Sequence, residues 1–113
     1  MSIEVTFRNI KPREEVRRRA EALYGKLAKF LDQSADGRVI ITAEHGASIV
    51  ELLVNAHGQT HRSIEEDDDL RTSLDRAFHT METSLRRSKE RRQDRTRRSR
   101  GAVEDGFESA DSE

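Results

Sequence analysis

The period of the hydrophobic pattern changes along the chain, and this change restricts the fold more than any other feature. Ile3, Val5 and Phe7 alternate with polar residues, which is the period of two of a half-buried strand. From residue 12 onward the period becomes three to four residues, which predicts an amphipathic helix over residues 12–31 with Pro12 in its first turn. The apolar positions of this helix are Val16, Ala20, Leu23, Leu27 and Phe30 or Leu31.

Three further strands are predicted over residues 38–44, 48–57 and 60–65. Asp36-Gly37 is a turn signal before the first of them, and His45-Gly46 and His57-Gly58 mark the two hairpins that join them. Such closely spaced strands predict an antiparallel meander.

A second helix is predicted after the acidic residues 65–69. Asp67, Asp68 and Asp69 offer an N-cap and first-turn carboxylates, so helix capping is a better interpretation of this acidic cluster than a cation site, which would need calcium-loop spacing and a glycine. The apolar stripe of the helix consists of Leu70, Leu74, Ala77, Phe78, Met81 and Leu85, and it stops there.

The order β-α-β-β-β-α predicts an α+β fold, a two-layer sandwich in which a four-stranded sheet carries two helices packed on one face. A chain of 113 residues with 33% apolar residues supports one small core. We expect residues 1–93 to form this domain and residues 94–113 to form a basic, then acidic, disordered tail. The sequence leaves open whether the polar residues 88–100 continue the second helix into solvent.

The charges are sorted along the chain, which the net charge of −1 hides. Residues 86–100 hold nine basic and two acidic residues, whereas residues 101–113 hold five acidic residues and none that is basic. Residues 1–31 carry eight basic residues against four acidic ones. Two positive elements of this strength indicate a polyanionic partner.

Several function classes find no support in the sequence. The absence of Cys excludes a disulfide framework, a thiolate metal site and a thiol nucleophile. No apolar run approaches a signal peptide or a membrane span, and neither a catalytic constellation, a phosphate loop nor metal-ligand spacing is found. The pair His57 and His61 could meet across a hairpin, but two histidines are too few for zinc. We therefore expect a cytoplasmic protein that is not an enzyme, without a cofactor, a small-molecule substrate or a membrane partner.

RNA is the polyanion that the composition favours. Arg predominates over Lys in residues 86–100, and a planar guanidinium donates two parallel hydrogen bonds to phosphate. One Tyr and no Trp provide no stacking platform, so we expect readout of backbone and shape. Two alternatives remain: a double-stranded-RNA-binding module, whose α-β-β-β-α order residues 12–93 share but whose second helix starts with Lys rather than acids, and an adaptor for an acidic protein surface.

The element order and two local motifs resemble a known family. The motifs are the ending Lys26-Leu27-x-Lys29 with an aromatic at position 30, and Asp69-Leu70 at the start of the second helix. Together they resemble the ribosome hibernation factors, which include hibernation-promoting factor and ribosome-associated inhibitor A and were once called sigma-54 modulation proteins. The resemblance covers residues 3–92, and the chain length with its acidic tail is similar to the short form of the family.

The resemblance implies a translation inhibitor that binds RNA of the small ribosomal subunit in the decoding channel and occludes the mRNA path and the tRNA sites. The expected partners are the small subunit and the whole ribosome, and the free protein is expected to be a monomer. Thr80 and Thr83 stand where the family usually has basic residues, and Arg71 where it has an aromatic. The RNA-binding residues implied are Arg8, Arg17, Lys26, Lys29, Arg87, Lys89 and Arg91, with Arg86 and Arg92 as neighbours.

Overall fold

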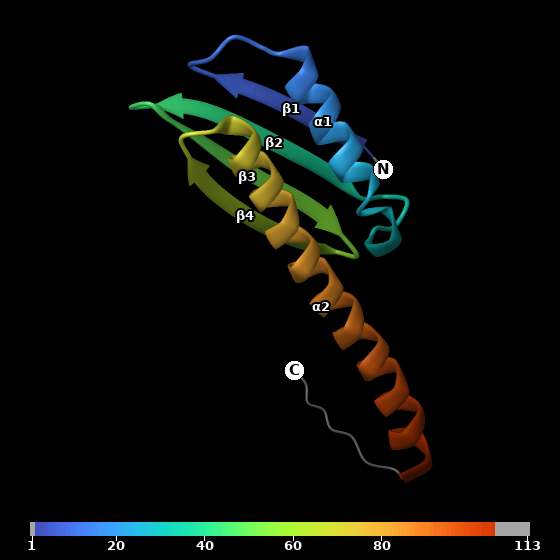
Figure 1. The fold of residues 1–113 in the computed structure, drawn as a ribbon. Helices are drawn as coiled ribbons and strands as arrows, with labels where there is room; N and C mark the ends of the chain where they lie inside the picture. The colour runs from blue at the N-terminus through green and yellow to red at the C-terminus, as the bar shows by residue number, and fades with distance from the viewer. Residues whose placement is uncertain (1, 106–113) are drawn as a thin grey trace.

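The computed structural model describes the backbone of residues 2–105 and the side chains of residues 2–95. One mixed sheet carries two helices on the same face (Figure 1). The elements are β1 (Ser2–Arg8), α1 (Glu14–Gly25), the 3₁₀ turn η1 (Ala28–Phe30), β2 (Asp36–Glu44), β3 (Ala47–Ala56), β4 (Gln59–Asp67) and α2 (Leu70–Asp105). The predicted α+β order and the two-layer arrangement are confirmed.

The sheet has the strand order β1-β2-β3-β4. β1 pairs with β2 in parallel, from Ser2 opposite Asp36 to Arg8 opposite Thr42, and α1 makes the crossover between them. The pairs β2-β3 and β3-β4 are antiparallel, as the meander predicted. Both predicted hairpin turns are present. His45 and His57 have φ of 53°, and the glycines that follow them, Gly46 and Gly58, are also at positive φ. A two-residue hairpin loop of this type requires positive φ at both positions.

The core lies between the sheet and the two helices. All six apolar positions predicted for α2 are buried, and Val39, Ile41, Val50, Leu52 and Val54 face them from the central strands. Two buried serines join the layers: Ser63 Oγ donates to the Ala77 carbonyl and Ser73 Oγ to the Ser48 carbonyl, both at 2.8 Å. These bonds satisfy polar groups that would otherwise be costly to bury.

The first helix is shorter than the sequence predicted. It begins at Glu14, after an extended N-cap residue Arg13, and ends at Gly25. A 3₁₀ turn then carries the chain to Phe30. Residues three apart eclipse one another in a 3₁₀ turn, so Leu27 and Phe30 still both enter the core, as the apolar stripe predicted.

The turn expected at Asp36-Gly37 is wrong, because both residues belong to β2. The glycine is needed for a packing reason: a Cβ on Gly37 would lie 2.8 Å from Cε1 of the buried Tyr24. A glycine in a strand can mark such a close approach rather than a turn.

α2 projects well beyond the sheet (Figure 1). Among the side chains that the structure describes, Leu85 is the last buried apolar residue of α2, and the part of the helix after it is about 30 Å long at 1.5 Å per residue. The helix therefore continues through the stretch that the sequence left open and past the expected domain boundary at residue 93, which remains a prediction. Part of the predicted tail, residues 106–113, lies outside the described residues.

Candidate functional site

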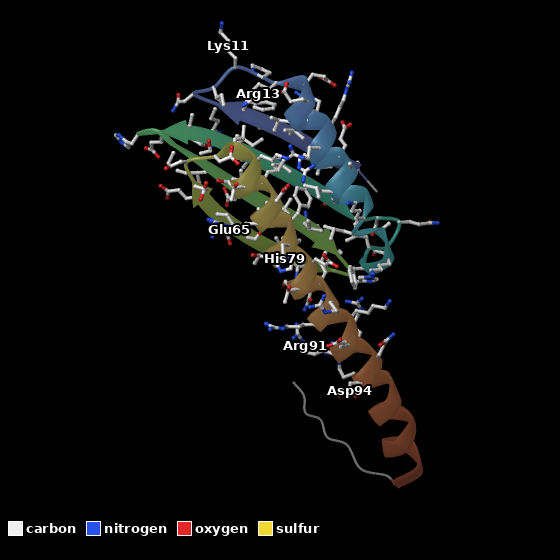
Figure 2. All side chains as sticks on the ribbon, in the orientation of Figure 1. Lys11, Arg13, Glu65, His79, Arg91 and Asp94 are labelled. Carbon is white, nitrogen blue, oxygen red and sulfur yellow. The ribbon has the colours of Figure 1, made fainter. Side chains whose placement is uncertain are left out.

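The predicted RNA-binding cations lie at two separate places in the fold. Most of them gather where α1 ends and where α2 leaves the sheet (Figures 1 and 2). We call this region the basic end. It comprises Lys26, Lys29, Arg86, Arg87, Lys89, Arg91 and Arg92.

Phe30 connects the two helical elements of the basic end. Its ring is buried, with 6% exposure, while the Nζ of Lys29 lies 5.3 Å and the Nζ of Lys89 5.8 Å from the ring centroid. Both distances fall within the range of cation–π attraction. One core aromatic thus positions ammonium groups that are far apart in sequence.

Arg8 and Arg17 lie away from the basic end. Arg8 ends β1, and its partner Thr42 is about 20 Å along β2 from Asp36, the residue at which β2 starts near η1. Arg17 lies 5.7 Å above the ring of Phe7 and 3.8 Å from the Glu14 carboxylate. These two residues could extend a binding face along α1, but they do not join the main cluster.

Ion pairing distinguishes the basic end from the rest of the surface. Elsewhere most cations face a carboxylate, as in Arg13–Glu15, Arg18–Glu14, Arg19–Asp75, Arg38–Glu4, Arg62–Glu51 and Arg76–Asp67. Within residues 2–95, by contrast, Lys26, Lys29, Arg86, Arg87, Lys89 and Arg91 form no ion pair. Their positive charge is left available for an external anion.

Arg19 and Asp75 fix the helices to one another at a second point. The Arg19 guanidinium donates two hydrogen bonds of 2.8 Å to the two carboxylate oxygens of Asp75. These bonds lower the pKa of Asp75 and raise that of Arg19. With the contacts around Phe30, this bidentate pair holds α1 and α2 in a defined spacing. The sequence could not identify this pair, because the two residues are 56 positions apart.

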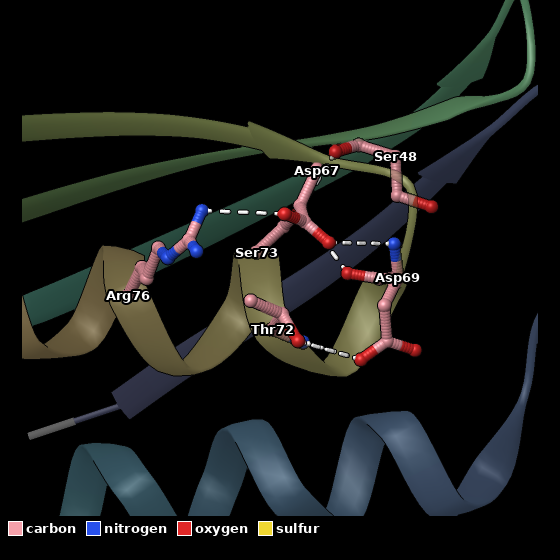
Figure 3. A network of polar contacts seen from close by, with 6 residues as sticks. All are labelled: Ser48, Asp67, Asp69, Thr72, Ser73 and Arg76. Carbon is pink, nitrogen blue, oxygen red and sulfur yellow. Dashed lines mark hydrogen bonds and ion pairs between the residues drawn. The ribbon is translucent and has the colours of Figure 1, made fainter.

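The acidic start of α2 is a capping structure, as predicted (Figure 3). The Asp69 carboxylate accepts hydrogen bonds from Thr72, at 3.1 Å from the backbone N–H and 2.7 Å from the hydroxyl, and these bonds lower the pKa of Asp69. Asp67 accepts from the Asp69 N–H at 2.9 Å and pairs with Arg76 at 3.3 Å. No group of three residues suited to a metal ion occurs in the described part of the chain.

The two threonines that replace expected basic residues have local partners. Thr80 Oγ1 donates to the Glu65 carboxylate and Thr83 Oγ1 to the His79 carbonyl, both at 3.3 Å. The middle of α2 therefore carries no positive charge at these positions. After Arg76, the next cation of α2 is Arg86, which directly follows the buried Leu85.

The fold and the site define a two-layer α+β domain with a cluster of cations at one end, and the comparisons specify the class of protein further. The model of the sigma 54 modulation protein / S30EA ribosomal protein family matches residues 3–93, so the chain belongs to this family of ribosome-associated modulation factors. This family is not known to be enzymatic.

Solved structures support the same fold. The N-terminal domain of Protein Y from Thermus thermophilus is 27% identical, with a TM-score of 0.72 over 77% of this chain and 98% of that one. A ribosomal subunit interface protein from Coxiella burnetii is 22% identical, with a TM-score of 0.68 over 80% of this chain and 99% of that one. No curated protein matches the chain. In the described part of the chain, no helix is both long and apolar enough to span a membrane.

Proposed function

We propose that this protein is a ribosome hibernation factor that binds RNA of the small subunit in the decoding channel. There it occupies the path of mRNA and the A and P sites of tRNA, and so inhibits translation in the cytoplasm under stress. The observation that carries the proposal is the basic end of a domain in a ribosome-associated family, where Lys26 and Lys29 after α1 and four cations of α2 form no ion pair within residues 2–95.

The chemistry of the basic end suits RNA backbone. Lysine and arginine side chains that lack an internal carboxylate gain most from phosphate, and each contact releases counterions from the RNA. Within residues 2–95 the aromatic side chains offer little surface for stacking on bases, because Phe7, Tyr24, Phe30 and Phe78 are all buried or partly buried. Recognition should therefore follow the shape and the phosphates of folded RNA rather than its sequence.

Inhibition in this proposal is steric and needs no bond making. The shared core and the Arg19–Asp75 pair hold the two helices as one rigid body. The phosphate contacts therefore hold a protein of fixed shape in the channel. Messenger RNA and tRNA cannot enter a volume that the protein fills.

Sucrose-gradient sedimentation with purified ribosomes tests the proposal. The test variant replaces Lys26, Lys29, Arg87 and Arg91 with Gln. The matched control replaces four ion-paired cations with Gln: Arg18, Arg38, Arg62 and Arg76. Both proteins lose four positive charges, and circular dichroism checks that both remain folded.

Wild type and control should sediment with the small subunit at low salt and dissociate at high salt. The test variant should stay at the top of the gradient. The slope of its log affinity against log salt concentration should become shallower by about one for each phosphate contact that is lost. Equal binding of both variants would refute the role of the basic end. Binding that resists nuclease and captures one protein would instead favour the adaptor, and preference for free duplex RNA would favour a double-stranded-RNA-binding module.

Truncation after residue 93 examines the domain boundary. If residues 1–93 form the ribosome-binding domain, the truncated protein should retain the fold and measurable small-subunit binding. Loss of all binding would place part of the interface in the projecting helix.

A further inference from the structure

A polar network lies under the basic end, between the β3–β4 hairpin and α2. His61 Nδ1 and Ser84 Oγ are 3.3 Å apart. One turn further along α2, the buried Ser88 hydroxyl donates to the Gln59 side chain at 3.3 Å and accepts from Arg92 at 3.2 Å. This network attaches the outgoing helix to the last strand and places His61 close to the arginines that follow Ser88.

Burial lowers the pKa of His61, and the positive charges of Arg92 and Arg91 on α2 and of His57 in the hairpin lower it further. Asp32 interacts with His57, and no carboxylate contributes to the shift of the His61 pKa. No described residue forms a hydrogen bond with the other ring nitrogen of His61, Nε2. The imidazole therefore lacks the anion that would make its protonated form favourable.

We propose that His61, Arg91 and Arg92 form a phosphate subsite and that RNA binding at this subsite takes up a proton. The inference rests on the proposed function and adds a pH response to it. A phosphate beside Arg91 supplies the missing negative charge, so the imidazolium becomes favourable in the complex. The Ser84 hydroxyl can accept a hydrogen bond as readily as it donates one, so it suits both protonation states.

The direction of the effect follows from linkage. Free His61 is neutral at pH 7.5. When the pH lies between the pKa of His61 in the free protein and its pKa in the RNA complex, the complex carries an additional proton. Binding should therefore tighten as the pH falls, by up to about tenfold per pH unit within that window. From pH 7.5 to 6.0 we expect roughly a threefold to tenfold gain in affinity from this residue.

Small-subunit binding at the two pH values, at constant ionic strength, tests the inference with matched histidine variants. His61→Asn removes the imidazole, while His45→Asn makes the same replacement in the β2–β3 turn, where φ of 53° suits asparagine. Wild type and His45→Asn should show the gain in affinity at pH 6.0, and His61→Asn should not. An equal pH response in all three proteins would overturn the inference while leaving the proposed function standing.

A second measurement does not depend on the ribosome. Imidazole NMR of the intact protein gives the titration of His61, with inorganic pyrophosphate as the anion probe. The midpoint of His61 should move upward with pyrophosphate. An unmoved His61 midpoint would refute the subsite. If no protein binds small subunits at either pH, the proposed function fails and the NMR result alone decides the inference.

Discussion

Replacing Gly37 with alanine tests whether the α1–β2 packing is as tight as the structure shows. Gly37 lies in β2 between Ile3 of β1 and Val54 of β3, directly under the ring of Tyr24. An alanine Cβ would lie 2.8 Å from Tyr24 Cε1 and 3.3 Å from Cζ. Ordinary carbon contacts are about 3.5–4.0 Å, so the ring must move by more than half an ångström.

The expected cost is a balance of two terms. Adding a methyl group to a packed core costs about 1–3 kcal/mol, and Tyr24 has little room to yield because it is only 4% exposed. Removing a strand glycine returns about 0.5–1 kcal/mol. The net destabilisation should be about 1–2 kcal/mol, which corresponds to a fall in Tm of about 4–16 °C for a domain of this size.

Urea denaturation followed by circular dichroism measures the change. Gly25→Ala is the matched control, because nothing lies within 4 Å of its Cβ position at the end of α1, and it should stabilise the protein by up to about 1 kcal/mol. In a Tyr24→Leu background the cost of Gly37→Ala should shrink, since the two sites are in contact. A Gly37→Ala protein at least as stable as wild type would refute the packing argument.

Three changes test the remaining features of the fold. Asp69→Ala removes the α2 cap and should lower the urea midpoint, whereas Asp68→Ala should leave it unchanged; equal midpoints would contradict the cap. Leu85→Ala should cost about 2–5 kcal/mol in the same assay, because Leu85 is 2% exposed where α2 leaves the core; a negligible loss would mean that the helix end is loosely packed. The pKa of Asp75 is lowered by Arg19, so the stability from this pair is complete above the ordinary aspartate pKa of about 3.9 and is lost as the pH falls below it. Wild type should therefore lose more stability than Asp75→Asn between pH 5 and pH 3, and parallel losses would contradict this role.

The fold was accessible from sequence where local signals and packing agree. The His45-Gly46 and His57-Gly58 hairpins need positive φ, and these dipeptides predict such turns. Asp36-Gly37 carries a similar signal, but there the glycine leaves room for the ring of Tyr24, which belongs to α1. A local motif cannot show whether a glycine is needed for its backbone conformation or to leave room for a side chain from a distant part of the chain. The same limit applies to α1: the apolar stripe correctly predicted the burial of Leu27 and Phe30, but it could not show that the turn carrying them is 3₁₀.

Only part of the candidate site could be predicted from the sequence. Counting charge along the chain identified the cations of α2, because nine basic residues within fifteen positions need no structure to be recognised. The sequence could not show that Phe30 draws Lys29 and Lys89 together, nor that Arg8 and Arg17 lie apart from them. His61 was considered only as a partner of His57 for a metal. Its proximity to Ser84 and Arg91 depends on how α2 crosses the end of β4.

The division between paired and unpaired cations separates folding from binding in this molecule. Arg19, Arg38 and Arg62 are paired with carboxylates within the fold, so an external phosphate would have to displace an internal partner. The cations of the basic end instead repel one another in the free protein, which raises the free energy of the unbound state. A polyanion removes that repulsion when it binds, and the pH response inferred for His61 follows from the same imbalance. Affinity should therefore depend strongly on salt and on pH, while the stability of the fold, carried by the core and the capped helices, should change much less.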